Sequence, residues 1–336
     1  MSQQVVLTGI KPTGIPHLGN LVGAIEPALK LSHSRDKRAL YFIADYHALT
    51  GLKDAQLLHD YSRSLAATWI ALGLDPNRVV FYRQSDVPEV FELSWILACF
   101  TPKGLMNRAH AYKAAVQKNQ EDGEADLDAG VNMGLYTYPV LMAADILLMQ
   151  TDWVPVGGDQ LQHIEITRDI AQYFNRQYRR EIFTLPEAMI DESGAVIPGL
   201  DGRKMSKSYN NTIPIFANPE ELRKLVFRIA TDSSRPGEPK DPDASTIFQI
   251  FRVVATDDET KAFRQLFEQG IAWKDAKEHL FDVLNRRLSG PRERFRDLID
   301  DTAALDEILA SGAQKARQVA GETMGAVRSA IGQTVE

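Results

Sequence analysis

The chain lacks several features that mark specialised classes of protein. One cysteine, Cys99, stands among 336 residues, which excludes an internal disulfide and any zinc or iron–sulfur site built from several cysteines. No apolar run reaches the length of about 18 residues that spans a bilayer, and the longest candidate, residues 140–149, contains Asp145. The first residues lack the basic start and apolar core of a signal peptide. We therefore expect a cytoplasmic protein without membrane contact.

An excess of positive charge is also missing. Lys and Arg number 38 against 45 Asp and Glu, a net charge of −7, which is not the balance of a protein that coats DNA. RNA is not excluded, because a local basic patch attracts a polyanion whatever the total charge. The arginine-rich stretch 286–296 offers Arg286, Arg287 and Arg292 as candidate RNA contacts. A solvated helix face is the alternative interpretation of this stretch.

The first 210 residues alternate apolar runs with helical patterns. Residues 5–7, 39–44 and 79–82 are continuous apolar runs of strand length. Strands that are apolar on both faces belong to a parallel sheet that helices cover on both sides. We predict a doubly wound, Rossmann-like α/β catalytic domain over residues 1–211, with a polar helical insertion at about 101–134.

The rest of the chain has a different pattern. No convincing strand follows residue 211, and helical patterns cover 259–269, 275–289, 291–300 and 304–331. Asn218 followed by Pro219 is a strong helix start, because asparagine caps free backbone amides and proline fits the first turn. We predict an α-helical domain over residues 212–336.

A glycine-rich loop, residues 9–20, follows the first predicted strand. Strand, loop and helix in this order present backbone N–H groups to phosphate. The loop lacks the Gly-Lys-Ser/Thr ending of a P-loop, and its glycines are five residues apart, so it does not match G-x-G-x-x-G either. It contains Lys11 and His17, and by itself it fits phosphate binding and an ordinary rigid turn equally well.

A second loop carries two lysines, Lys204 and Lys207, which can reach one polyanion together. Taken alone, this loop is equally a solvated basic segment. Taken together, His17-Leu18-Gly19-Asn20 and residues 204–208 resemble the signature pair of the class I aminoacyl-tRNA synthetases. That pair is a His-Ile-Gly-His element after the first strand and Lys-Met-Ser-Lys-Ser after the last. The second element is intact, and Asn20 replaces the final histidine of the first, as is common in the tryptophan and tyrosine branch.

This resemblance implies that the chain joins an amino-acid carboxylate to the α-phosphate of ATP and then transfers it to tRNA. The carboxylate is already ionised at neutral pH, so the catalyst must supply cations and hydrogen-bond donors rather than a general base. The resemblance assigns catalytic contacts to Lys204, Lys207, Ser208, His17 and Asn20. It adds to the ATP site Lys11, Pro12, Thr13, Gly19, Gly157, Gly158, Asp159, Val196, Met205 and Ser206. Mg²⁺ would be carried with ATP and bound mainly by its phosphates, without a metal site made by the protein alone.

Residues 138–149 form a predicted helix that is apolar all round except for Asp145. A buried carboxylate is costly unless it is hydrogen-bonded. Asp145 therefore either pairs with a neighbouring group of the protein or accepts a hydrogen bond from a ligand. An acceptor in an apolar helix that contains methionine suits an aromatic substrate with one N–H or O–H.

The same helix narrows the resemblance to the bacterial tryptophanyl-tRNA synthetases. Tyrosyl relatives typically carry Gln where this chain has Met142, and the segment 151–165 also matches the tryptophanyl pattern. The resemblance implies L-tryptophan and tRNA(Trp) as substrates, a helical domain that reads the anticodon, and a homodimer. It assigns to tryptophan the residues Gly9, His47, Tyr138, Met142, Asp145, Ile146, Val154, Val156 and Gln160, with Asp145 accepting the indole N–H.

Three other functions fit the sequence less well. A tyrosyl-tRNA synthetase is disfavoured by Met142. A small-molecule nucleotidyltransferase of the same fold would have no use for the long helical C-terminal part. A non-catalytic RNA-binding paralogue would be expected to lose the lysine loop or the pocket, and both are intact.

Lys11 stands where many relatives have Gln, which would place a cation beside the carboxylate or the phosphates.

Overall fold

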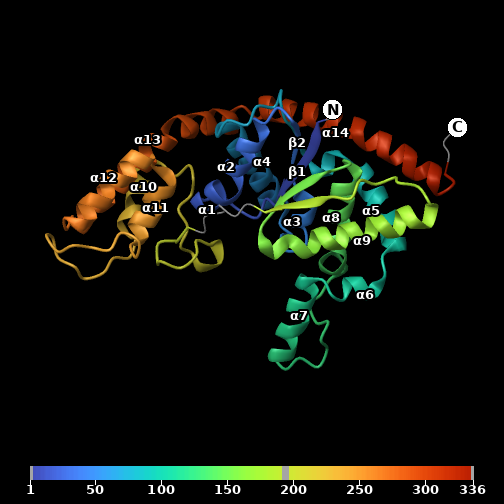
Figure 1. Cartoon of the computed structure of the whole chain (residues 1–336), viewed down its shortest axis with the longest axis horizontal. Coiled ribbons are helices and arrows are strands. Elements are labelled where there is room, and N and C mark those ends of the chain that lie inside the picture. Colours follow the sequence, from blue (N-terminus) through green and yellow to red (C-terminus); the bar gives the residue numbers. More distant parts are fainter. Residues whose placement is uncertain (1–2, 191–196, 334–336) are drawn as a thin grey trace.

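The computed structural model describes residues 3–190 and 197–333, apart from the side chain of Asp159. In this part of the chain one parallel sheet forms the centre of the molecule, in the strand order β3-β2-β1-β4-β5 (Figure 1). Its strands are β1 (Gln4–Ile10), β2 (Lys37–Ile43), β3 (Val80–Arg83), β4 (Trp153–Val156) and β5 (Glu187–Ile190). The predicted α/β class is confirmed. The prediction found the first three strands and missed β4 and β5, which are short, and β4 contains Pro155.

Side chains of β2 alternate between two apolar cores, one on each face of the sheet. Tyr41 and Ile43 enter the first core, where the Tyr41 ring packs on Trp69 of α4 (Ala55–Ala71). Leu40 and Phe42 enter the second core, which α5 (Glu89–Phe100), α8 (Met133–Leu148) and α9 (Leu161–Tyr178) cover. Helices therefore cover both faces, as the continuous apolar strands predicted.

Shorter elements surround the site and the insertion. The segment after β1 runs through α1, a π-helical turn and α2 without a break in helical backbone. The predicted insertion contains α6 and α7 and projects from the body of the molecule (Figure 1). The bounds are α1 (Leu18–Asn20), the π-helical turn (Leu21–Ile25), α2 (Glu26–Ser32), α3 (Asp45–Ala48), α6 (Lys103–Met106) and α7 (His110–Glu121).

The second half of the chain is helical, as predicted. Its helices are α10 (Pro219–Phe227), α11 (Thr246–Val254), α12 (Asp257–Glu268), α13 (Trp273–Asp300) and α14 (Thr302–Ala330). The Asn218 side chain caps α10 by accepting from the Glu221 amide at 2.9 Å, as expected. The sequence prediction missed α11.

The predicted separation of two helices, 275–289 and 291–300, was wrong, because α13 runs without interruption through residue 290 and Pro291. A proline inside a helix removes one backbone hydrogen bond and favours a kink. Tertiary contacts hold the second half of α13 in place. The rings of Phe295 and Phe216 pack together with their centres 4.5 Å apart, and the Arg294 guanidinium donates to the Ala71 carbonyl at 2.8 Å.

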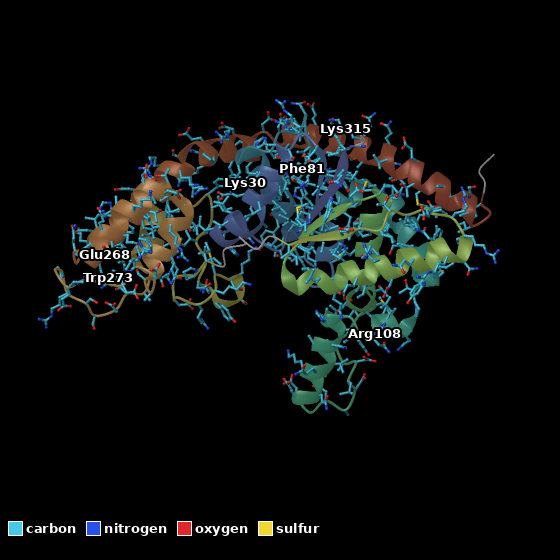
Figure 2. All side chains as sticks on the ribbon, viewed as in Figure 1. Lys30, Phe81, Arg108, Glu268, Trp273 and Lys315 are labelled. Atoms are coloured by element: carbon cyan, nitrogen blue, oxygen red, sulfur yellow. The ribbon has the colours of Figure 1, made fainter. Side chains whose placement is uncertain are left out.

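The last helix, α14, returns to the sheet and lies against the edge strand β3. A β-carbon at Gly312 would overlap the Phe81 carbonyl oxygen, so only glycine permits this approach of helix to strand. Phe81 and Lys315 mark this place in Figure 2, whereas Glu268 and Trp273 mark the far end of the helical part. The domain boundary at residue 211 stays a prediction, and α14 shares its apolar residues with the cores of the sheet.

No helix within residues 3–190 and 197–333 is long and apolar enough to cross a membrane.

Candidate active site

Two adjoining cavities open at the carboxyl ends of β1 and β4, the point where the strand order reverses. The smaller cavity has a volume of about 440 Å³ and the larger about 950 Å³. They share Gly9, Pro155, Val156 and Gly157. Open parallel sheets bind ligands at this switch point. The arrangement provides space for two ligands that meet at the shared residues.

The structure brings together in the smaller cavity all nine residues that the sequence assigned to an amino-acid substrate. Leu7, Phe42 and Ala44 add apolar surface to its wall. Gly9 is required at this place, because a β-carbon there would overlap the ring of Phe42. The cavity is therefore largely apolar and closed beside β1, with Asp145 as a buried acceptor in its wall.

Asp145 is held by two hydrogen-bond donors on other elements. Both of its carboxylate oxygens accept from Gln84 Nε2 at 2.9 Å, and Oδ2 also contacts His47 Nε2 at 2.9 Å. Burial raises the pKa of Asp145, and the hydrogen bonds from His47 and Gln84 oppose that rise. The sequence prediction missed Gln84, which lies directly after β3 and is fully buried. A polar residue at the end of a predicted strand was the available signal.

At the other end of the smaller cavity, Tyr138 and Gln160 both contact the ring of His163. Tyr138 Oη is hydrogen-bonded to His163 Nε2, and Gln160 Oε1 lies 2.8 Å from His163 Nδ1. The Lys11 ammonium lies 5.4 Å from the centre of the Tyr138 ring, a distance at which a cation and an aromatic face attract. Burial raises the pKa of Tyr138 and lowers that of Lys11.

The larger cavity joins the two motif loops. It is lined by His17, Gly19 and Asn20 on one side and by residues 204–208 on the other, with Thr13 and Gly158 between. Lys11 lines the smaller cavity instead, and Pro12 is buried and lines neither. Val196 and the side chain of Asp159 lie outside the described residues.

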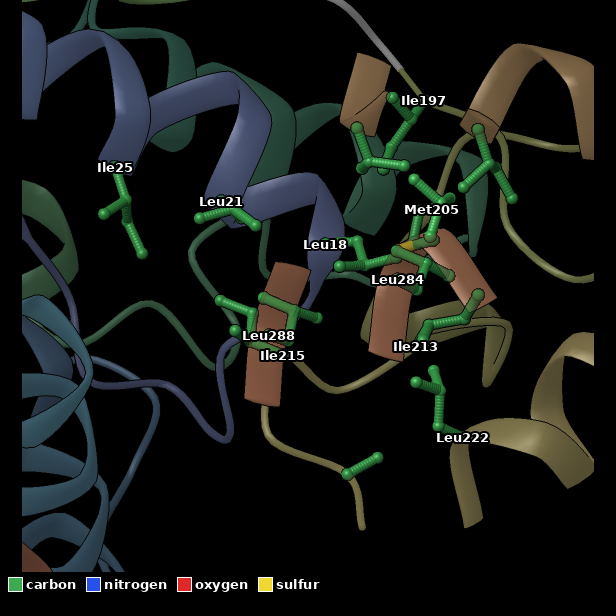
Figure 3. Close-up of a cluster of buried hydrophobic side chains, with 14 of the residues drawn as sticks. Leu18, Leu21, Ile25, Ile197, Met205, Ile213, Ile215, Leu222, Leu284 and Leu288 are labelled. Atoms are coloured by element: carbon green, nitrogen blue, oxygen red, sulfur yellow. The ribbon is translucent and has the colours of Figure 1, made fainter. Parts of the chain in front are cut away.

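Backbone hydrogen bonds and apolar packing hold these loops together. Leu18 N donates to Ile213 O at 2.9 Å, and Ile215 N donates to Pro16 O at 3.1 Å. The Met205 side chain is buried in the core that Leu18 and Leu284 share, and Figure 3 shows the three meeting between α1 and α13. Met205 therefore anchors the lysine loop to the body of the protein while lining the cavity.

Lys207 reaches the glycine-rich loop at Gly14. A β-carbon at Gly14, whose φ is +131°, would lie 3.1 Å from Lys207 Nζ. Gly19 has a similar role, because a β-carbon there would lie 3.0 Å from the ring of His17. Gly14 therefore leaves room for the Lys207 side chain, and Gly19 leaves room for the His17 ring. The two motifs, distant in the sequence, thus meet in one site.

His17 begins α1 and is locked in place by its own motif. Its backbone amide donates to Asn20 Oδ1 at 3.1 Å, and the Asn20 amide donates to the His17 carbonyl at 2.8 Å. Burial, with a smaller contribution from the charge of Lys207, lowers the pKa of His17 to about 4. The imidazole is therefore neutral at pH 7 and offers a hydrogen bond rather than a positive charge.

Asn211, which the sequence prediction missed, fixes the shape of the lysine loop. Its Oδ1 accepts from Ser206 N at 2.8 Å, and its Nδ2 donates to Asp201 Oδ1 at 2.7 Å. Asn211 is buried, and Gly199 packs so closely on it that a β-carbon would overlap the amide. A single asparagine after a lysine-rich loop gives no recognisable signal in one sequence.

The family of tRNA synthetases class I (W and Y) matches residues 2–291 of the chain. The chain belongs to this family.

Members of the family specific for tryptophan resemble the chain over nearly its whole length. The tryptophan–tRNA ligase of Neisseria meningitidis is 53% identical over 332 residues, 99% of this chain and 98% of the relative. That of Pseudomonas aeruginosa is 53% identical over 97% of this chain and 73% of its own length. The tryptophanyl-tRNA synthetase of Campylobacter jejuni, solved with ADP and tryptophan, superposes with a TM-score of 0.89 at 43% identity, covering 98% of this chain and 100% of that one.

All three arginines predicted as RNA contacts have partners within the protein. Arg287 forms an ion pair with Glu26 of α2 and donates to the Val253 carbonyl at 3.3 Å, so it joins the helical part to the sheet domain. Arg292 is buried and donates to Asn285 Oδ1 at 3.0 Å. Arg286 is exposed and pairs with Glu259. The three arginines do not form the single surface patch that the sequence suggested, because they point to different sides of α13.

Proposed function

We propose that this member of the family is a tryptophan–tRNA ligase. It forms tryptophanyl-adenylate from L-tryptophan and ATP and then transfers the tryptophanyl group to the 3′ end of tRNA(Trp). The observation that carries the proposal is the apolar cavity with Met142 and Asp145 in its wall, which opens beside the lysine loop. The relatives named tryptophan–tRNA ligase at 53% identity support it.

The indole ring occupies the smaller cavity, with its N–H donating to Asp145. Gln84 and His47 keep the Asp145 carboxylate in place for this bond. Met142 packs against the ring, and Val154 and Val156 complete the wall. A site that hydrogen-bonds a substrate N–H rejects analogues without it, because its buried acceptor is then left unpaired. Tyrosine, with a smaller side chain and no indole N–H, is disfavoured.

The amino-acid carboxylate lies at Gly9 and Gly157, where the two cavities meet, and attacks the α-phosphate of ATP from there. Lys204 and Lys207 bind the leaving pyrophosphate. Neutral His17 and the side-chain Nδ2 of Asn20 donate hydrogen bonds to phosphate oxygens. Lys11 adds a positive charge beside the carboxylate. These groups act by electrostatic stabilisation and by positioning, because the carboxylate needs no general base.

Mg²⁺ accompanies ATP and neutralises phosphate charge. In the proposed complex, phosphate oxygens would supply most of its ligands, as is usual for Mg²⁺ bound together with a nucleotide. The lysines of the larger cavity provide the remaining positive charge around the phosphates.

The helical second half of the chain binds the anticodon part of tRNA(Trp), with Arg286 as an exposed phosphate contact. The protein acts as a homodimer in the cytoplasm and binds no DNA. We place the dimer face on α5 and α8, where two large apolar side chains are exposed: Trp95 of α5 is 73% exposed and Met133 of α8 is 70% exposed.

The test is ATP-dependent attachment of labelled L-tryptophan to a tRNA(Trp) transcript, with L-tyrosine and a tRNA(Tyr) transcript as controls. The proposal expects stable label on tRNA(Trp) with tryptophan alone. Label on tRNA(Tyr) with tyrosine would transfer the function to the tyrosine branch. Folded protein that charges neither tRNA would support a non-catalytic role.

A further inference from the structure

His163 lies behind the wall of the smaller cavity and bridges two residues of that wall. It is buried on α9 and, in the described part of the chain, lines neither of the two cavities. Its Nε2 is hydrogen-bonded to Tyr138 Oη, and its Nδ1 lies 2.8 Å from Gln160 Oε1. Both partners line the smaller cavity, and we place the ammonium group of the proposed tryptophan substrate at them. His163 then connects both contacts of one ligand group.

These bonds determine which ring nitrogen carries hydrogen. The oxygen of an amide only accepts, so His163 Nδ1–H donates to Gln160. In the neutral ring, Nε2 then keeps its lone pair and accepts from the Tyr138 hydroxyl. The Tyr138 and His163 rings also meet edge to face, with centres 5.3 Å apart, which restricts the rotation of Tyr138. The direction of each hydrogen bond is therefore fixed from behind the cavity.

The consequence concerns the side of Tyr138 and Gln160 that faces the ligand. Because the Tyr138 hydroxyl donates its hydrogen to His163, its oxygen presents lone pairs to the cavity. The hydrogen bond from His163 Nδ1–H fixes the orientation of the Gln160 amide, and the second lone pair of Gln160 Oε1 is left to accept from the ligand. An ammonium group has three donors and no acceptor, so it needs this polarity. Without His163, the Tyr138 hydroxyl is free to turn its hydrogen toward the ammonium group.

We infer that His163 is a positioning residue that makes Tyr138 and Gln160 hydrogen-bond acceptors for the ammonium group of the amino-acid substrate. This inference rests on the proposed function. It predicts that His163 discriminates between ligands that carry the ammonium group and ligands that lack it, although it touches neither.

The experiment measures dissociation constants by titration calorimetry for three ligands. L-Tryptophan has both polar groups, tryptamine keeps only the ammonium group, and indole-3-propionate keeps only the carboxylate. His163→Leu is expected to weaken tryptophan and tryptamine about tenfold, a loss of about 1.4 kcal/mol, and indole-3-propionate less than twofold. His163→Gln is expected to stay within threefold of the wild type, because a carboxamide also has one donor and one acceptor. Glu165→Ala, at an exposed position of the same helix, is the matched control and should change none of the three.

Equal weakening of all three ligands by His163→Leu would overturn the inference and leave His163 as packing for the cavity wall. Unchanged affinity for tryptophan would overturn it as well. If the leucine variant does not fold, His163→Asn, which is too short for both partners, replaces it in a double-mutant cycle with Tyr138→Phe. If His163 acts through the Tyr138 hydroxyl, the loss of tryptophan affinity caused by His163→Asn should be smaller in the Tyr138→Phe background. Additive losses of affinity would contradict the inference. A wild type that binds no tryptophan would instead overturn the proposed function.

Discussion

Replacing Asp145 by Asn tests how the indole group is recognised. The carboxylate accepts from Gln84 and from His47, each at 2.9 Å, and in the proposed complex also from the indole N–H. An asparagine amide has one oxygen and one NH₂ group, so at least one of these three donors would face another donor. A hydrogen bond to a charged group contributes about 1.5–3 kcal/mol, and a buried donor left unpaired costs a similar amount.

A loss of about 2–3 kcal/mol corresponds to a fall of about 30- to 150-fold in kcat/KM for tryptophan. The assay is tryptophan-dependent ATP–pyrophosphate exchange, run beside the isostere of tryptophan in which sulfur replaces the indole N–H. Asp145→Asn should reduce the preference for tryptophan over this isostere, whereas damage to the fold would reduce both rates equally. Thermal unfolding controls for stability, because the variant also changes the hydrogen bonds that residue 145 accepts from Gln84 and His47. Unchanged preference with a folded variant would refute the recognition role.

Four further outcomes follow from the structure. Lys207→Ala should slow adenylate formation at least 100-fold while leaving the Kd for tryptophan within threefold, measured by single-turnover kinetics and calorimetry; equal losses would contradict its contact with pyrophosphate. His17 should show a pKa of about 4 by NMR, below the ordinary value of 6.5. The contribution of the neutral ring to the stability of the fold is therefore complete above pH 6.5 and is lost as the pH falls toward 4. A ring that titrates near 6.5 would contradict its burial. Gly312→Ala should lower stability by about 3 kcal/mol, seen as a lower Tm, because α14 must move off Phe81; an unchanged Tm would show that this close approach is absent. Arg286→Ala should raise the KM for tRNA(Trp) and leave pyrophosphate exchange unchanged, and unaltered tRNA kinetics would make Arg286 an ordinary surface residue.

Local patterns in the sequence predicted the parts of the fold that depend on local chemistry. The apolar runs located β1, β2 and β3, and Asn218 with Pro219 located the start of α10. The apolar helix with Asp145 at its centre is α8, and the motif residues His17 and Lys207 come together as their resemblance to one family implied. Each of these features is carried by residues close together in the chain.

The features that were missed depend on contacts between distant segments. The sequence suggested two helices on either side of residue 290, whereas contacts of Phe295 with Phe216 and of Arg294 with Ala71 hold the second half of a continuous α13 in place. Gly312 has meaning only beside Phe81, which lies far away in the sequence. Gln84 and His163 gain their roles from Asp145, Tyr138 and Gln160, and no periodicity or spacing links these positions.

ATP–pyrophosphate exchange on the wild-type protein without tRNA, with tryptophan or tyrosine as the amino acid, tests the assignment of the smaller cavity to the indole ring. We predict exchange that depends on tryptophan and is near background with tyrosine, because the cavity pairs an apolar wall containing Met142 with the acceptor Asp145. Exchange supported by tyrosine and not by tryptophan would contradict the assignment of that cavity to the indole ring.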